Sequence, residues 1–179
     1  MKKVYGIVGM LSLVLGCALV VAAQQDKAKR PSPPAQAKWD LGDGKSVTLD
    51  YGSPRAKGRK IYGELVPFGQ VWRTGANEAT ALVTPVDLTV GGATVPAGSY
   101  TIFSIPNQDK WTLVISKKTG EWGTDYPGQA NDLARVDMKV STLPSAVENF
   151  TVSFEKAGSG ANLNIDWETT RASLMVSKK

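Results

Sequence analysis

The sequence of 179 residues contains no histidine and a single cysteine, Cys17. Histidine is the commonest general base and the commonest zinc ligand, so its absence excludes Ser-His-Asp and Cys-His catalysis and the usual zinc sites. Cys17 lies in an apparent export signal. Whether it is removed or lipidated, the exported chain has no free thiol for disulfide or thiolate chemistry. Catalysis would have to use a carboxylate, a lysine, a tyrosine or a metal held by oxygen ligands.

Other signatures of chemistry are also missing. No serine sits in a GxSxG string, which argues against acyl transfer through a nucleophile elbow. The acidic residues of segments 107–109 and 131–137 are too sparse for a calcium loop, so we predict neither a metal site nor a cofactor. Without Lys2 and Lys3, the 21 basic residues become 19 against 16 acidic ones, and the net charge is +3. No stripe of basic and aromatic residues accompanies this small charge, so we expect no nucleic-acid partner.

The N-terminus has the pattern of an export signal. "MKK" precedes an almost unbroken apolar run from Val4 to Ala23, and the small residues of "VAA" favour cleavage after Ala23. Alternatively, "LVLGC" resembles a lipobox, in which Cys17 would carry a lipid and anchor the protein to the outer membrane; the bulky Leu15 and the apolar residues after Cys17 argue against this. The run is also long enough to remain as an uncleaved anchor. We expect a periplasmic or extracellular protein with a signal peptide over residues 1–23.

The next segment, residues 24–38, reads "QQDKAKRPSPPAQAK". It is polar, rich in proline and without periodicity, which is typical of a disordered tether. We therefore expect a single folded domain over residues 39–179, long enough to bury a core of its own.

Hydrophobic residues in this domain recur with a period of two, which indicates half-buried strands. The segments "YTIFSI" (100–105) and "WTLVIS" (111–116) are apolar on both faces and predict a central hairpin, while residues 173–179 resemble a frayed end. We predict an all-β domain, an antiparallel, jelly-roll-like β-sandwich of about eight to ten strands. The alternating triplets are Val47, Leu49 and Tyr51; Val136, Met138 and Val140; Phe150, Val152 and Phe154; and Leu163, Ile165 and Trp167.

Several of these stretches carry a family resemblance. "DYGSPRAKGRKIYGELVPFGQVWRTGANEAT", followed by "VPAGSYTIFSIP", "WTLVISKKTGEWG" and "NFTVSFE", resembles the bacterial family known as domain of unknown function 2911, over about residues 46–176. The resemblance implies an exported all-β protein. It implies no reaction and no ligand.

A basic cluster lies near the start of the domain. Arg55, Lys57, Arg59 and Lys60 fall within six residues, and the neighbouring proline and glycine place them in a loop. Arginine side chains and loop N–H groups in such a cluster can hold a carboxylate, sulfate or phosphate. The alternative is a solvated loop in which one arginine reaches an acidic neighbour such as Asp50.

The stretch "VWRTGANEAT" (71–80) also has two interpretations. In the first it forms a turn, across which Arg73 and Glu78 pair and lock the loop to the sheet. In the second it forms a binding site, with Trp72 as an apolar wall and Arg73, Asn77 and Glu78 as polar groups. A secondary aromatic platform is possible at Trp122 and Tyr126, whose loop positions suit stacking on a sugar.

Three functions remain open. The first is an exported non-catalytic module that binds a polar or anionic small molecule or a glycan. The second is a glycoside-type hydrolase using Glu78 with Asp50 or Glu64, which requires two carboxylates across a cleft. The third is a structural or protein-interaction domain of the envelope. The expected ligand-binding residues of the first are Arg55, Arg59, Lys60, Trp72, Arg73, Asn77 and Glu78.

Overall fold

The computed structural model describes residue 27 and residues 29–179. The predicted signal peptide, its cleavage after Ala23 and the alternative role of Cys17 lie outside these residues. Within the described chain, no helix has the length and apolar character needed to cross a membrane.

Nine strands form one antiparallel sheet, with the order β1-β2-β3-β6-β7-β8-β9-β4-β5. This confirms the predicted all-β, single-domain fold and its strand number. A short 3-10 helix, η1 (Gln129–Asn131), precedes β8. The strands are β1 (Pro34–Gly42), β2 (Lys45–Gly52), β3 (Thr80–Thr84), β4 (Leu88–Val90), β5 (Ala93–Val95), β6 (Gly98–Ile105), β7 (Lys110–Ser116), β8 (Asp132–Ala157) and β9 (Gly160–Lys178).

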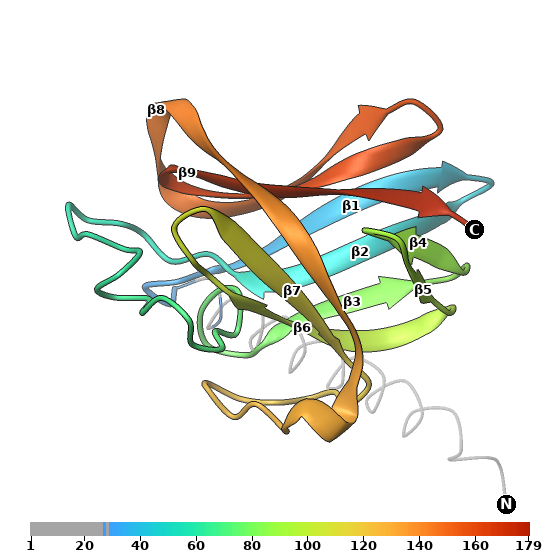
Figure 1. Ribbon diagram of the computed structural model, residues 1–179, viewed down its shortest axis with the longest axis horizontal. Coiled ribbons are helices and arrows are strands. Elements are labelled where there is room, and N and C mark those ends of the chain that lie inside the picture. The colour runs from blue at the N-terminus through green and yellow to red at the C-terminus, as the bar shows by residue number, and fades with distance from the viewer. Residues whose placement is uncertain (1–26, 28) are drawn as a thin grey trace, which may run out of the picture.

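The sheet folds over on itself, so that the two layers of the sandwich belong to one continuous sheet. Figure 1 shows the long β8 and β9 crossing above β1, β2 and β3. β8 makes this possible because its first part pairs with β7 and its second part pairs with β9, with register shifts between residues 142 and 151. Trp39 of β1 reaches Phe154 of β8, with 6.1 Å between ring centroids. One hydrophobic core lies between the layers.

The period-two pattern predicts most of this sheet correctly. Val47, Leu49 and Tyr51 are buried, and β6 and β7 form the expected hairpin. Two boundaries differ from the prediction. Residues 34–38, which we expected in the tether, pair with β2 as part of β1. The C-terminal segment is not frayed, because β9 continues to Lys178 and pairs there with β4.

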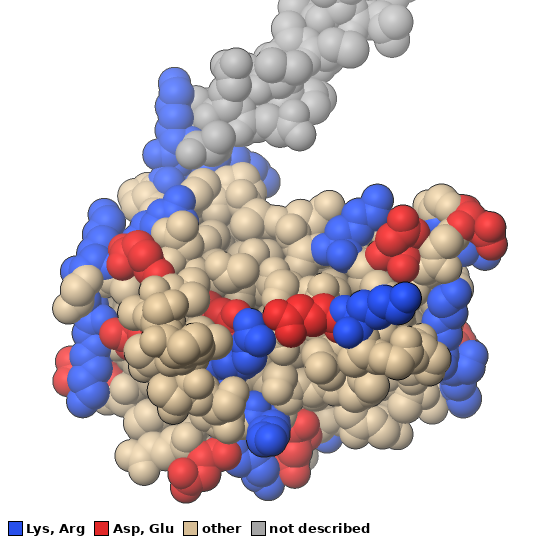
Figure 2. All heavy atoms as spheres, turned by 90° about the horizontal axis from the view of Figure 1, so that it is seen from above, with Lys and Arg blue, Asp and Glu red and all other residues tan. Residues whose placement is uncertain are grey.

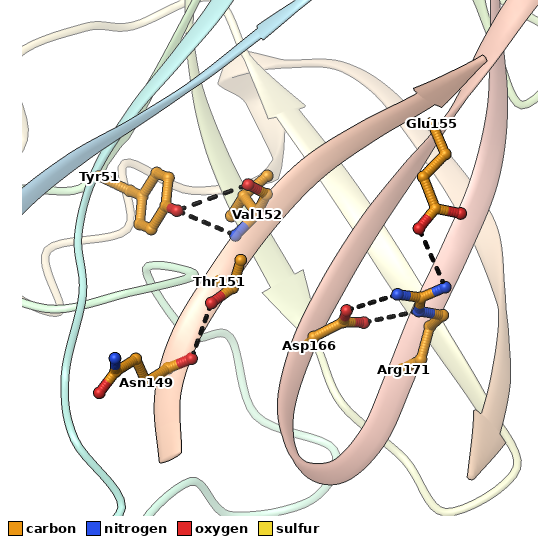
Figure 3. A network of polar contacts seen from close by, with 7 residues as sticks. All are labelled: Tyr51, Asn149, Thr151, Val152, Glu155, Asp166 and Arg171. Carbon is orange, nitrogen blue, oxygen red and sulfur yellow. Dashed lines mark hydrogen bonds and ion pairs between the residues drawn. The ribbon is translucent and has the colours of Figure 1, made fainter. Parts of the chain in front are cut away.

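Along one edge the second half of β8 pairs with no strand, and residues 51–56 bind part of its backbone there. The Tyr51 hydroxyl accepts a hydrogen bond from the N–H of Val152 (3.1 Å) and lies 3.4 Å from its carbonyl (Figure 3). The Phe150 N–H donates to the carbonyl of Pro54, and the Ala56 N–H donates to that of Glu148. Since buried backbone groups need partners, this edge fixes the start of the long loop 53–79.

Five aromatic rings hold the rest of that loop against the sheet. Trp72 stacks on Trp167 with 6.1 Å between centroids, and Tyr62 meets Trp111 edge-on at 4.8 Å. Phe150 contacts both Trp72 and Trp167. The Trp72 backbone also exchanges two hydrogen bonds with Ser104 at the end of β6. Edge-to-face and offset contacts of this kind add to the free energy of hydrophobic burial.

A charged cluster marks the bend of β9. Glu168, which follows Trp167, has a positive φ of 50°. Beyond the bend, Arg171 returns toward Asp166 and donates two hydrogen bonds to its carboxylate, at 2.8 and 2.7 Å (Figure 3). Glu155 of β8 also pairs with Arg171, at 3.4 Å. Arg171 is thus shared by two carboxylates, and these contacts tie the bend of β9 to β8.

We call the five rings Tyr62, Trp72, Trp111, Phe150 and Trp167 the aromatic cluster. Its packing predicts that substitutions of two tryptophans, one inside the cluster and one outside it, differ widely in their effect on stability. Trp72→Ala should lower the free energy of unfolding by about 3–5 kcal/mol, because it removes a buried ring. Trp122→Ala is the matched control and should cost about 1 kcal/mol or less, since Trp122 is 57% exposed and Trp72 only 9%. Urea unfolding followed by circular dichroism measures both. Equal losses would contradict the proposed role of the cluster.

Candidate functional site

The basic loop is held rigidly by the domain. Glu148 accepts hydrogen bonds from Ala56 and Lys57, through its carbonyl and its carboxylate respectively. The guanidinium of Arg59 donates to the carbonyls of Arg55 (2.6 Å) and Ala56 (3.0 Å). The orientation of Arg59 is therefore set by backbone groups, which leave its positive charge unbalanced.

Two adjoining hollows lie beside this loop, and Ser32 and Arg59 line both of them. The larger has a volume of about 330 Å³ and the smaller about 280 Å³. We call the pair the basic hollow, because four cations and no carboxylate line it. The cations are Arg55, Lys57, Arg59 and Arg73; apolar groups of the larger hollow include Pro54, Leu65, Val66, Pro67, Val71 and Trp72.

No ion pair neutralises these four cations within the described chain. Burial lowers the pKa of Arg73, and its Nε is buried without a hydrogen-bond partner. An arginine keeps its charge in such surroundings, so Arg73 stays cationic while poorly solvated. On the face formed by β8 and β9, by contrast, basic and acidic side chains lie side by side in a band (Figure 2). The uncompensated charge is a property of the loop.

The structure brings together part of the predicted site. Arg55, Arg59, Trp72 and Arg73 all line the basic hollow, although Trp72 is a largely buried ring at its floor and not an exposed wall. Lys60 does not line it; its ammonium lies 3.2 Å from Glu64 in an exposed pair. The predicted set is therefore split, because Asn77 and Glu78 face a different hollow.

The predicted pair between Arg73 and Glu78 does not form. Glu78 instead pairs with Lys27 (3.4 Å) and Arg30 (3.0 Å) from the N-terminal segment. Asn77, at a φ of 64°, donates to the carbonyl of Ser32 at 2.8 Å. We call Lys27 and residues 29–33 the strap, since they are attached to the domain by these contacts. The interpretation of Arg73 and Glu78 as a mutual lock is wrong.

Other residues of the same stretch do lock the loop. Trp72 donates from Nε1 to the carbonyl of Gly75 at 3.2 Å, and Thr80 donates to the carbonyl of Thr74 at 2.7 Å. A Cβ on Gly52 would collide with the carbonyl of Ala76, so the two chain segments cross at a distance that only glycine permits.

Two of the three carboxylates proposed for hydrolysis lie in the hollow beside the strap. This strap hollow has a volume of about 220 Å³ and includes Asp50 and Glu78, whereas Glu64 lies elsewhere. Burial alone would raise the pKa of Glu78, but hydrogen bonds from its own backbone, Arg30 and Lys27, with the charge of Arg30, lower it. A general acid needs the opposite shift, which argues against Glu78 as a proton donor.

The two candidate platform aromatics do not form a common surface. Trp122 is exposed beneath the guanidinium of Arg30, whose Cζ lies 5.9 Å from the ring centroid. Tyr126 packs edge-on against Phe103 at 5.3 Å, and its hydroxyl lies 2.8 Å from the carboxylate of Asp132. We therefore do not assign a stacking platform to this pair.

Sequence reasoning missed the contribution of the strap. Ser32 lines the basic hollow, and Arg30 holds Glu78, yet both belong to a segment with the composition of a tether. Gln70 and Thr124 also line the larger hollow without any local signal in the sequence. Across the described part of the chain, no group of three or more acidic side chains could hold a metal ion.

The lowered pKa of Glu78 predicts that the strap loosens in acid. Because the folded pKa lies below the unfolded value, the contribution of this carboxylate is complete above about pH 4.3 and is lost as the pH falls through the lowered value. The NMR shift of the Trp122 indole N–H should report this transition. Glu78→Gln should abolish it and Glu64→Gln should preserve it; a transition that survives in Glu78→Gln would refute the assignment.

A family model described as "Protein of unknown function (DUF2911)" matches residues 32–176. No curated protein and no solved structure matches the chain. The matched residues include the basic loop, the aromatic cluster and both Glu78 and Trp122, so these features lie inside the region that defines the family. The chain belongs to the DUF2911 family, as the resemblance in its sequence predicts.

Proposed function

We propose that the protein is an exported, non-catalytic binding module for a small molecule that combines an anionic group with an apolar part. The observation that carries the proposal is the basic hollow, in which four cations have no ion-pair partner among the described residues. Like charges held together repel one another, and a bound anion relieves that repulsion.

The chemistry of the lining favours a carboxylate, sulfate or phosphate. Arginine presents several N–H donors in a planar array, which matches the oxygens of such groups. Arg59 is already oriented by two backbone carbonyls, so little conformational freedom is lost when it binds an anion.

The apolar side of the hollow supports a ligand with a hydrophobic part. Leu65, Val66 and Pro67 lie along the larger hollow, with Trp72 at its floor. A volume of about 330 Å³ falls within the range of small-molecule sites in proteins. An uncharged glycan suits this lining less well, because it would leave the arginines unpaired.

Binding of an anionic amphiphile tests the proposal. 8-Anilinonaphthalene-1-sulfonate should bind the wild-type protein, and its affinity should fall with added salt. The double variant Arg59→Gln/Arg73→Gln should lower the affinity about tenfold or more, a loss of about 1.4 kcal/mol or more, by removing two charge-assisted contacts. Fluorescence titration gives the dissociation constants.

Two controls accompany this titration. Lys139→Gln/Lys156→Gln removes two exposed cations far from the hollow in sequence and should leave the affinity unchanged. N-phenyl-1-naphthylamine, which lacks the sulfonate, should not distinguish the arginine variant from the wild type. The proposal fails if the lysine variant loses as much affinity as the arginine variant.

Export is tested by the mature N-terminus. The apolar run and "VAA" predict a chain that begins at Gln24. Mass spectrometry of protein recovered from the envelope of the producing cell measures this. A lipid-modified N-terminal Cys17 would support the alternative anchor, whereas an intact Met1 would contradict processing by either route.

A further inference from the structure

The guanidinium of Arg30 occupies a defined position on the domain. One of its nitrogens, Nη1, lies 3.0 Å from each carboxylate oxygen of Glu78. Its Cζ lies 5.9 Å from the centroid of the Trp122 ring. A carboxylate on one side and an aromatic face on another are the two groups that a guanidinium prefers.

Backbone contacts within the domain bring Glu78 and Trp122 together. The two residues form an isolated antiparallel bridge. On either side of it, the Ala79 N–H donates to the carbonyl of Glu121, and the Gly123 N–H donates to that of Asn77. The side chain of Glu121 accepts a further hydrogen bond from Thr101 of β6 at 2.8 Å. The backbone that carries the carboxylate and the ring is thus held by the domain itself.

The charge of the neighbouring hollow is also suited to a cation. Lys27 and Arg30 come from the strap, and the remaining ionisable carboxyl groups in the lining are Asp50 and Glu78. Without the strap cations, the domain presents two carboxylates here. On the domain itself, the strap hollow is therefore negatively charged and suits a cation, whereas the basic hollow is positively charged and suits an anion.

We infer that Glu78 and Trp122 form a binding site for the guanidinium group of an arginine side chain, and that Arg30 fills this site as a tethered occupant. The side chains of Arg30 and Glu78 are 32% and 44% exposed, so a competing arginine can enter without unfolding of the domain. Guanidinium is preferred over ammonium because it is planar, weakly hydrated and able to stack on an indole. This site is separate from the basic hollow and does not rest on its proposed function.

Emptying the site tests the inference. In the Lys27→Ala/Arg30→Ala variant, N-acetyl-arginine methylamide should bind about tenfold or more tightly than in the wild type, because a tethered competitor acts at an effective concentration in the millimolar range. The indole N–H signal of Trp122, assigned from its loss in Trp122→Phe, reports binding. Unchanged indole signals of Trp39, Trp72, Trp111 and Trp167 show that the variant is folded.

Three comparisons give the chemistry. N-acetyl-citrulline methylamide, which has a similar shape without the charge, should not bind. Adding Glu78→Gln to the emptied variant should abolish arginine binding, whereas adding Lys139→Ala should have no effect. Equal affinity of the wild type and the emptied variant, equal binding of citrulline, or binding that survives Glu78→Gln overturns the inference; so does the absence of arginine binding in every variant.

Discussion

The packing of Tyr62, Trp72, Trp111, Phe150 and Trp167 is the interaction on which the rest of the structure depends. The loop 53–79 contains no strand or helix of its own, so buried rings contribute much of the free energy that orders it. Trp72 and Trp167 also line the larger part of the basic hollow. The same contact thus completes the hydrophobic core and forms the floor of the candidate site.

The strap lies between two hollows whose domain residues carry charges of opposite sign. On one side, loop residues 55–59 and Arg73 present positive charge that the domain leaves unbalanced. On the other, Glu78 is balanced by cations that come from outside the folded sheet. The strap contributes Ser32 to the first hollow and Arg30 to the second, so its position affects both. The strap therefore helps to shape both hollows, although its sequence has the composition of a tether.

The sequence predicts the sheet well because strand alternation is a local signal. Val47, Leu49 and Tyr51 stand at alternate positions in the sequence, and all three are buried. The candidate site is predicted only in part, since partner choice depends on distant segments. Nothing near Glu78 indicates that Arg30 pairs with it, and nothing near Trp72 shows that Trp167 will cover it. The basic loop is recognisable in the sequence because its four charges fall within six residues.

The origin of the five rings has a consequence for folding. Tyr62 and Trp72 come from the first half of the domain, while Phe150 and Trp167 come from β8 and β9 at its end. Contacts between residues so distant in sequence form slowly, because a long segment must be closed before they contribute. A chain that lacks β9 cannot assemble the cluster. Completion of the core therefore waits for β9, so a growing chain cannot reach its native packing before this strand is available.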